Sequence, residues 1–313
     1  MSFRQCYKLV TKQAIRWFPG HMGKGLKQMQ QKLKSVDCIL EVHDARIPFS
    51  GRNPEFQHTI AGGGVKPHIL VLNKKDLISP KDQRYIRDAL KDKEQLDHII
   101  FTNCKDQQCS GIRKLMPLAN DLIGKSGRYN REGEKDYCVM VIGVPNVGKS
   151  SLLNVLRNRH LKRKSVSQVG GIAGVTRSVL EKIKISEDPL IYMIDTPGIL
   201  EPKISSDEMG MKLALVGCLQ DHLVGEDLIA DYLLYWLNKN ERFEYVPLMG
   251  LEKPNDDISE VLVAYANKQG VQRKLKGADG QILMIPDILH AARHFIKLFR
   301  TKAFGNINLD KEI

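Results

Sequence analysis

The stretch that decides the fold is Gly143-Val144-Pro145-Asn146-Val147-Gly148-Lys149-Ser150. It fits the pattern G-x-x-x-x-G-K-[ST] of a phosphate-binding loop, with a short apolar run before it and a helical pattern after it. In such a loop, backbone N–H groups and the helix N-terminus hold nucleotide phosphates. We expect an α/β domain in which Lys149 bridges the β- and γ-phosphates and Ser150 is a Mg²⁺ ligand. The predicted phosphate side of the site also includes Asn146, Val147, Gly148 and Ser151.

A second motif, Asp195-Thr196-Pro197-Gly198, follows another short apolar run. Asp195 is expected to hold Mg²⁺ through a water molecule, and the N–H of Gly198 is expected to sense the γ-phosphate. The glycine-rich stretch 170–176 lies between the two motifs. Thr176 is the predicted switch threonine, which reaches Mg²⁺ only when the γ-phosphate is present. The alternative is that these glycines simply form a loop.

A third motif, Asn73-Lys74-Lys75-Asp76, predicts which base is bound. The carboxylate of Asp76 can accept both N–H donors on the edge of guanine, which adenine lacks. Asn73 and the aliphatic stem of Lys74 would support the base. Thr102-Asn103-Cys104 follows the next apolar run and is the candidate loop that closes over the base, although it matches the usual Ser-Ala-Lys only loosely. These residues favour GTP over ATP.

The order of the motifs is unusual. In an ordinary G domain the phosphate loop comes first and the guanine loop near the end, whereas here the guanine loop comes first. Apolar runs of strand length alternate with helical patterns, which predicts a mainly parallel sheet with helices on both faces. We therefore expect a circularly permuted P-loop G domain. The charged, glycine-containing segment 124–136 would be the linker that joins the ancestral ends.

From about residue 205 the pattern changes to helices only, with three apolar stripes at helical spacing. The expected organisation is a basic N-terminal extension (1–16), a permuted G domain with an N-terminal helix (17–204) and a small all-helical C-terminal domain (205–313). The last helix carries Arg293, Lys297 and Arg300 as a basic ridge. Either a solvated helix face or an RNA contact would explain this ridge.

The composition points to a polyanionic partner. The chain has 313 residues, with 48 Lys and Arg against 36 Asp and Glu, and hence a formal net charge of +12. Such an excess favours nucleic acid or an anionic membrane surface, although a basic chain can also serve solubility alone. The six cysteines include no CxxC pair, which favours buried, reduced thiols over a zinc site. No apolar stretch is long enough to predict a transmembrane helix.

The N-terminus is basic and free of acids. Arg4, Lys8, Lys12 and Arg16 all precede the first acidic residue, Asp37, and apolar residues recur between them at helical spacing. This pattern is typical of a short mitochondrial presequence. It is equally consistent with a basic tail before a helix.

Two details concern the mechanism of hydrolysis. Ile199 follows Gly198, where many GTPases have the glutamine that positions the attacking water, so that water must be oriented from elsewhere. Asn146 lies inside the phosphate loop, where its amide could help to bind a monovalent cation beside the phosphates. A simple turn asparagine is the alternative.

With these motifs, the chain resembles the YlqF/RbgA family of permuted ribosome-assembly GTPases, and in particular its mitochondrial members. The resemblance covers about residues 16–300, and besides the three motifs it rests on Trp17-Phe18-Pro19-Gly20-His21-Met22 and Asp44-Ala45-Arg46-Ile47-Pro48. It implies that His21 acts in place of the missing glutamine and that K⁺, bound through Asn146, stimulates hydrolysis. Ala173 departs from the proline common in relatives, which leaves the switch geometry open.

The resemblance implies a GTPase that hydrolyses GTP to GDP and phosphate while bound to the large mitochondrial ribosomal subunit and its rRNA. It would act in the assembly of that subunit and in regulating mitochondrial translation, as a monomer in the mitochondrial matrix, with peripheral contact to the inner membrane left open. Two alternatives are an RNA-binding scaffold stabilised by GTP and a signalling G protein with a protein effector.

Overall fold

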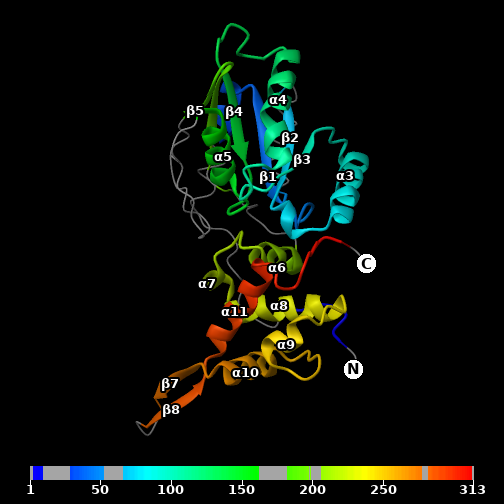
Figure 1. Ribbon diagram of the computed structural model, residues 1–313, viewed down its shortest axis with the longest axis vertical. Helices are drawn as coiled ribbons and strands as arrows, with labels where there is room; N and C mark the ends of the chain where they lie inside the picture. The colour runs from blue at the N-terminus through cyan, green and yellow to red at the C-terminus, as the bar shows by residue number, and fades with distance from the viewer. Residues whose placement is uncertain are drawn as a thin grey trace.

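A mainly parallel sheet forms one end of the molecule and a group of helices forms the other (Figure 1). The computed structural model describes residues 3–9, 29–52, 66–161, 182–196, 198, 206–276 and 281–311. Within these residues, six strands form the sheet in the order β3-β2-β1-β4-β6-β5, and only β5 runs antiparallel to its neighbour. The strands are β1 (Cys38–Asp44), β2 (His68–Asn73), β3 (Ile99–Phe101), β4 (Tyr137–Ile142), β5 (Lys182–Glu187) and β6 (Leu190–Asp195).

The central strands are continuous apolar runs because both of their faces are covered. All seven residues of β1 are buried, and so are the last five of both β2 and β4. Such runs are typical of parallel sheets with helices on each side. Cys38 and Cys138 lie on these strands as buried free thiols, as predicted.

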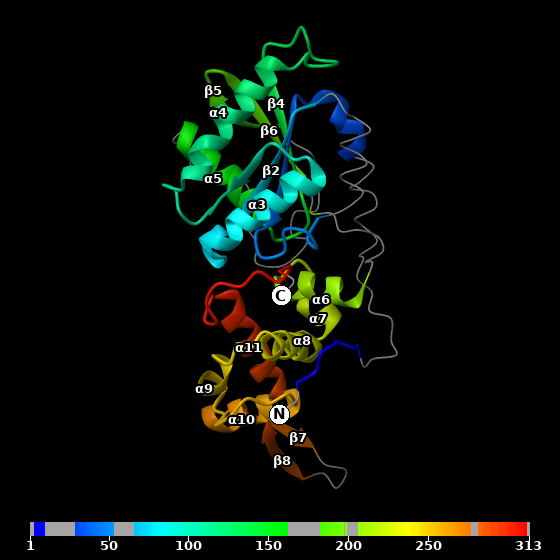
Figure 2. The same cartoon turned by 90° about the vertical axis from the view of Figure 1, so that its right-hand side faces the viewer.

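Helices cover both faces of the sheet, which confirms the prediction (Figure 2). On one face, α4 (Ser110–Lys125) and α5 (Lys149–Leu161) pack in the largest apolar cluster. On the other face, α3 (Pro80–Glu94) packs over β2 and β3, while Met29 and Val36 pack over β1 and β4. Described residues therefore pack on both faces of the sheet.

The permuted order of the motifs becomes a spatial arrangement in this sheet. β1 and β2 come before the phosphate-loop strand β4 in sequence, yet β4 lies between β1 and β6. Because β1, β2, β4 and β6 are parallel, their carboxyl ends meet at one edge. The three nucleotide motifs follow β2, β4 and β6 and are therefore brought to that edge.

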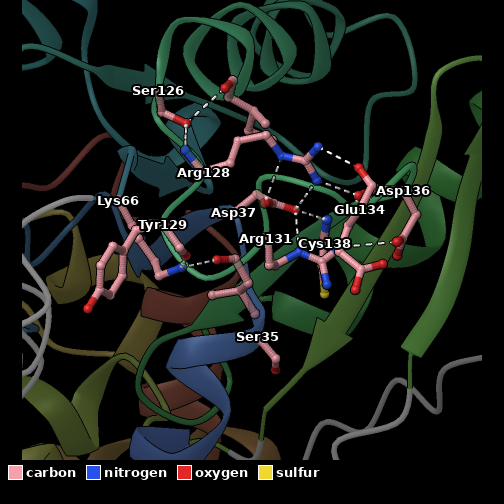
Figure 3. Close-up of polar contacts among 12 residues, drawn as sticks. Ser35, Asp37, Lys66, Ser126, Arg128, Tyr129, Arg131, Glu134, Asp136 and Cys138 are labelled. Carbon is pink, nitrogen blue, oxygen red and sulfur yellow. Dashed lines mark hydrogen bonds and ion pairs between the residues drawn. The ribbon is translucent and has the colours of Figure 1, made fainter.

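The predicted linker after α4 is fixed to the opposite edge by ion pairs (Figure 3). Its anchor is Asp37, which is fully buried just before β1. Asp37 accepts hydrogen bonds from Arg128 Nε at 3.1 Å, Arg131 Nε at 2.9 Å and the backbone N–H of Cys138 at 2.7 Å. Lys66 donates to the carbonyl oxygens of Val36 and Tyr129. The segment that joins the two halves of the permuted domain is thus part of the folded structure.

The C-terminal region is helical except for one hairpin. Its helices are α6 (Asp207–Leu215), α7 (Asp221–Val224), α8 (Glu226–Lys239), α9 (Tyr245–Met249), α10 (Ile258–Gln269) and α11 (Ile288–Arg300). The prediction of an all-helical region is corrected by β7 (Gln272–Lys276) and β8 (Ile282–Pro286), which pair as an antiparallel hairpin. A run of four apolar residues, Ile282–Ile285, is too short for periodicity to separate strand from helix.

The N-terminal residues 3–9 pack against the C-terminal helices. Tyr7 lies between Tyr232 and Tyr235, with ring centroids 5.1 Å and 5.6 Å away, and Arg4 forms ion pairs with Asp231 and Asp256. This part of the predicted extension therefore belongs to the folded helical region. The bounds proposed for the three domains stay a prediction.

Candidate functional site

The guanine and phosphate loops touch directly at the carboxyl edge of the sheet. Asn73 ends β2, and its Nδ2 donates to the carbonyl oxygen of Val147 at 2.8 Å. Gly148 adopts a left-handed φ of 101°, and a Cβ there would lie 2.3 Å from Asn73 Nδ2. The close approach of the two loops therefore requires glycine at this position. It joins the predicted base and phosphate halves into one site.

The phosphate loop buries the side chain of its lysine. Lys149 is 7% exposed, and its Nζ lies 3.2 Å from the Gly143 carbonyl oxygen and 3.0 Å from that of Val144. Burial lowers the pKa of Lys149 to about 8, while the nearby Asp195 carboxylate acts in the opposite direction. A cation with so little water around it is strongly attracted by a phosphate group. This environment is suited to the predicted role of Lys149.

The predicted magnesium ligands are adjacent. Ser150 Oγ donates to Asp195 Oδ2 at 2.8 Å, although the two residues are on α5 and β6. One hydroxyl and one carboxylate, completed by phosphates and water, form an oxygen environment of the kind that Mg²⁺ prefers. Gly198 lies against the phosphate loop, because a Cβ at this glycine would be 2.6 Å from Pro145 Cα. The donor set therefore fits Mg²⁺, with the N–H-bearing Gly198 beside it.

On the base side, the carboxylate of Asp76 has an available acceptor. Asp76 lies in the 3₁₀ helix η2 (Lys75–Leu77), and its Oδ1 is buried with no hydrogen-bond partner among the residues the structure describes. A buried carboxylate oxygen ordinarily has a donor. The N1–H and N2–H groups of a guanine would supply such donors. This observation supports the predicted recognition of guanine by Asp76.

The loop after β3 is hydrogen-bonded to the guanine loop, so it lies beside the residues that are predicted to bind the base. Asn73 Oδ1 accepts from Thr102 Oγ1 at 3.1 Å and from the Cys104 N–H at 3.2 Å. The Lys75 N–H also donates to the Thr102 carbonyl at 3.0 Å. Asn103 instead holds its own turn, because its Oδ1 accepts from the Lys105 N–H. Thr102 and Cys104 are thus hydrogen-bonded to the guanine loop, whereas the side chain of Asn103 bonds within its own turn.

Asp44 and Arg46 lie at the site, although neither belongs to the three nucleotide motifs of the sequence. Asp44 ends β1 and forms ion pairs with Arg46 at 2.8 Å and with Lys74 at 2.9 Å. Burial opposes ionisation of Asp44, but the two cations outweigh it and hold the pKa of this carboxyl well below its usual range. Asp44 therefore fixes Lys74 beside the base-binding residues. The signal in the sequence was a pair of opposite charges directly after a buried strand.

The helical region contacts the phosphate side of the site through the end of α6. Asn146 has a left-handed φ of 58°, and its Nδ2 donates to the Gly217 carbonyl at 2.8 Å. Arg46 approaches the Val216 carbonyl at 3.5 Å. Arg300 donates to the carbonyls of Ala214 and Leu215 and pairs with Asp221.

Side chains thus satisfy four consecutive carbonyls at a helix C-terminus, where cations are favourable. Two of these side chains come from the candidate nucleotide site. The predicted basic ridge on α11 is divided, because Arg300 is used in this contact and Arg293 pairs with Glu226 at 3.1 Å.

The segment after α11 returns to the base side of the site (Figure 1). Lys302 Nζ donates to the carbonyl oxygen of Asp76 at 2.6 Å, and the Ile307 N–H donates to that of Leu77 at 3.0 Å. The Leu309 N–H donates to the Arg46 carbonyl at 2.8 Å. The helical region is therefore bonded to both the base loop and the phosphate loop.

Some predicted site residues lie outside the described residues. These are His21 with its segment 17–22, Thr176 with Ala173 and the glycine-rich stretch 170–176, and Ile199. The roles assigned to the individual site residues stay predictions. Within the described part of the chain, no helix is long and apolar enough to cross a membrane, and no cluster of three His, Cys, Asp or Glu side chains could hold a metal ion.

Comparison with known proteins gives close relatives over the whole chain. Mitochondrial GTPase 1 of Aedes aegypti is 62% identical over 99% of this chain and 98% of the relative. Mitochondrial ribosome-associated GTPase 1 of Bos taurus is 47% identical over 100% of this chain and 93% of the relative. Ribosome biogenesis GTPase A of Bacillus licheniformis is 30% identical over 95% and 98% of the two chains.

A family model and a solved structure agree with these relatives. Residues 138–275 match the model described as a 50S ribosome-binding GTPase. The crystal structure of GNP-bound YlqF from T. maritima has the same fold, with a TM-score of 0.58 at 22% identity over 92% of this chain and 98% of that one. The predicted resemblance and the permuted G-domain fold are confirmed. The chain belongs to the family of YlqF/RbgA-type circularly permuted GTPases, in the group of the mitochondrial GTPases 1.

Proposed function

We propose that this GTPase of ribosome biogenesis binds the large mitochondrial ribosomal subunit and its rRNA, acts in the assembly of that subunit and regulates mitochondrial translation. Hydrolysis of GTP to GDP and phosphate would drive its release. The observation that carries this proposal is the bonding of the helical region to both ends of the nucleotide site. The relative from Bos taurus is named as ribosome-associated, and the bacterial relative as a ribosome biogenesis GTPase.

The coupling runs through backbone carbonyls. Asn146 of the phosphate loop binds the carbonyl of Gly217, and Lys302 binds that of Asp76, so a change of either loop alters a bond to the helical region. A ligand shifts such an equilibrium by its difference in affinity for the two arrangements. GTP and GDP differ at the γ-phosphate, near Gly198. We infer that the phosphate-side contact responds to hydrolysis and that the base-side contact stays closed with either nucleotide.

The chain's own residues would divide the work of hydrolysis. Lys149 and the backbone of the phosphate loop hold the phosphates, and Asp76 orients the base. Mg²⁺, held by Ser150, Asp195 and Thr176, would supply positive charge at the phosphates. His21 would orient the attacking water, and Asn146 would contribute to a K⁺ site.

The expected location follows from the relatives, whose names are mitochondrial. We propose a monomer in the matrix, and peripheral contact with the inner membrane is an alternative site of action.

His21→Ala tests the catalytic part of the proposal. We expect kcat for GTP to fall about 10²- to 10⁴-fold, since this is the usual contribution of a group that orients or deprotonates the attacking water. GTP affinity should be unchanged. The measurement is phosphate release by purified protein with large mitochondrial subunits, Mg²⁺ and K⁺. A GTP-stabilised scaffold predicts instead that turnover and subunit release are unaffected, and a signalling G protein predicts no stimulation by the subunit.

Asn146→Ala tests the cation. We expect the wild-type protein to hydrolyse GTP several-fold faster in K⁺ than in Na⁺, and the variant to show the same low rate in both salts. The physical reason is that Na⁺ is too small for a site formed with a side-chain amide and phosphate oxygens. Asn267→Ala, on the exposed side of α10, makes the same chemical change away from the site and is the matched control, which should keep the K⁺ stimulation. Equal rates of the wild-type protein in the two salts would exclude the K⁺ role.

A further inference from the structure

The hairpin of β7 and β8 exposes an unusual amount of large apolar surface. Four of its aliphatic side chains are about half exposed or more: Leu275 at 46%, Ile282 at 64%, Leu283 at 52% and Met284 at 53%. The hairpin extends from the end of the molecule that is remote from the sheet (Figures 1 and 2). Contiguous exposed aliphatic residues usually mark a surface that another molecule covers.

The pairing of the two strands shows how these side chains are arranged. Side chains of directly paired residues lie on the same face of a sheet, and successive residues alternate between faces. Leu275 pairs with Leu283, and Arg273 with Ile285, on one face. On the other face, Lys274 pairs with Met284, and Lys276 with Ile282. One face therefore carries one exposed cation and the other face two, each beside exposed aliphatic groups, with the cations on β7 and the aliphatic groups mostly on β8.

The charge of this region is strongly positive. Residues 261–300 contain seven Lys and Arg against two Asp. Arg293 and Arg300 have acidic partners inside the protein. In contrast, Arg273, Lys274 and Lys276 are exposed and form no ion pair with any other described residue. These three cations are therefore available to an external polyanion.

We propose that the β7–β8 hairpin inserts into a crevice of structured RNA. Arg273 on one face and Lys274 and Lys276 on the other would contact phosphates of the two walls. The aliphatic side chains of β8 would pack against sugars and bases, as apolar wedges do in nucleic-acid grooves. This inference rests on the proposed function, since it identifies a surface that would contact the rRNA of the large subunit.

Cations and aliphatic groups lie on both faces of the hairpin, which favours RNA over a membrane surface or a protein strand as the partner. A flat bilayer surface covers one face of a hairpin and would leave the cations or aliphatic groups of the other face in water. A protein strand added to the free edge of β8 would pair with the backbone and give no role to cations on both faces of β7. A crevice with phosphates on each wall accounts for all the exposed groups.

Two double variants and one control test the proposal in the full chain. Lys274→Gln with Lys276→Gln removes two charges, and Ile282→Ser with Met284→Ser removes two exposed aliphatic groups on the same face. The control, Arg113→Gln with Lys114→Gln, makes the same charge change on exposed residues of α4. Affinity is measured for purified large mitochondrial subunits and for their protein-free rRNA, with a non-hydrolysable GTP analogue. A photoreactive side chain placed at Met284 identifies the contacted molecule.

The expected result is about tenfold weaker binding for each hairpin variant at moderate salt. The control should bind as tightly as the wild-type protein. The charge variant should also reduce the slope of log K against log salt by about 1.5. Crosslinks from position 284 should reach rRNA.

Three results would overturn the proposal. One is unchanged affinity of both hairpin variants while the wild-type protein binds. A second is crosslinking to ribosomal proteins alone. A third is that the hairpin variants bind vesicles of phosphatidylcholine and cardiolipin more weakly than the wild-type protein does, while their binding to subunits and rRNA is unchanged. If the wild-type protein fails to bind subunits, the proposed function fails, and the protein-free rRNA then decides the hairpin by the same comparison.

Discussion

Asp76→Asn is expected to change the preferred base from guanine to xanthine. An asparagine would oppose its amide N–H₂ to the N2–H₂ of guanine, so that two donors face each other. Xanthine carries a carbonyl oxygen at this position and would accept from the amide. A site built to bond a specific donor discriminates against a wrong partner by about 10⁴-fold. We expect GTP affinity to fall by about 10³-fold or more and xanthosine triphosphate to become the tighter ligand.

The structure makes this a test of recognition and not of stability. The backbone carbonyl of Asp76 keeps its bond from Lys302, because the substitution changes only the side chain. Competition binding with GTP, ATP and xanthosine triphosphate gives the result. Asp88→Asn, on the exposed side of α3, makes the same chemical change and should leave all three affinities unaltered. Unchanged GTP affinity would show that Asp76 does not contact the base, and an equal loss for GTP and xanthosine triphosphate would show that the substitution disturbs the site without changing base selection.

The sheet and the assembly of the motifs could be predicted because they depend on local patterns. Each motif directly follows a buried strand, and the carboxyl ends of parallel strands meet at one edge whatever their order in the chain. This rule brings Asn73 to Val147 and Ser150 to Asp195. It holds for a permuted chain because it depends on strand direction and not on sequence order.

The contacts between the sheet and the helical region could not be predicted, because they join residues far apart with no shared pattern. Asn146 reads as a cation ligand or a turn residue, and in the structure it binds Gly217. Arg300 reads as part of an exposed ridge, yet it caps α6. Single charged residues carry no information on whether a partner lies inside the molecule or outside. For the same reason, the sequence could not show that Arg293 and Arg300 of the predicted ridge on α11 have acidic partners within the protein.

The N-terminus shows a similar limit. The acid-free pattern of residues 1–16 left a presequence and a basic tail as alternatives. The structure shows Arg4 paired with two carboxylates and Tyr7 packed between two tyrosines of α8. These acids lie more than 200 residues away in sequence, so a window around the N-terminus contains no trace of them. An amphipathic basic segment can therefore be a part of the fold.

Asp37→Asn is expected to lower the free energy of unfolding by about 3–5 kcal/mol, the usual effect of removing one partner from a buried ion pair. The asparagine can still accept from the Cys138 N–H. However, it leaves Arg128, whose side chain is 15% exposed, without its carboxylate partner, and it leaves Arg131, at 6%, with Asp136 alone. Urea unfolding should show a lower midpoint with an unchanged slope. Asp136→Asn is the control, because its side chain is 17% exposed and pairs with only one side of Arg131, and it should cost less than about 1 kcal/mol.

This substitution also distinguishes the stability of the joint, which is the linker 124–136 with Asp37, from binding at the nucleotide site. Asp37 precedes β1, at the edge of the sheet opposite the nucleotide motifs, so GTP affinity of the folded variant should be unchanged. A double-mutant cycle with Arg131→Gln should give a coupling of about 1–3 kcal/mol, because the two groups share one buried contact. Equal stability of Asp37→Asn and the wild-type protein would mean that the ion pairs of Figure 3 do not hold the joint. A chain with its ancestral ends joined must hold the new linker in place without distorting the strands before and after it. The buried carboxylate of Asp37 does this by binding Arg128 and Arg131 of the linker. It lies at the edge of the sheet opposite the nucleotide motifs, so the linker does not obstruct the nucleotide.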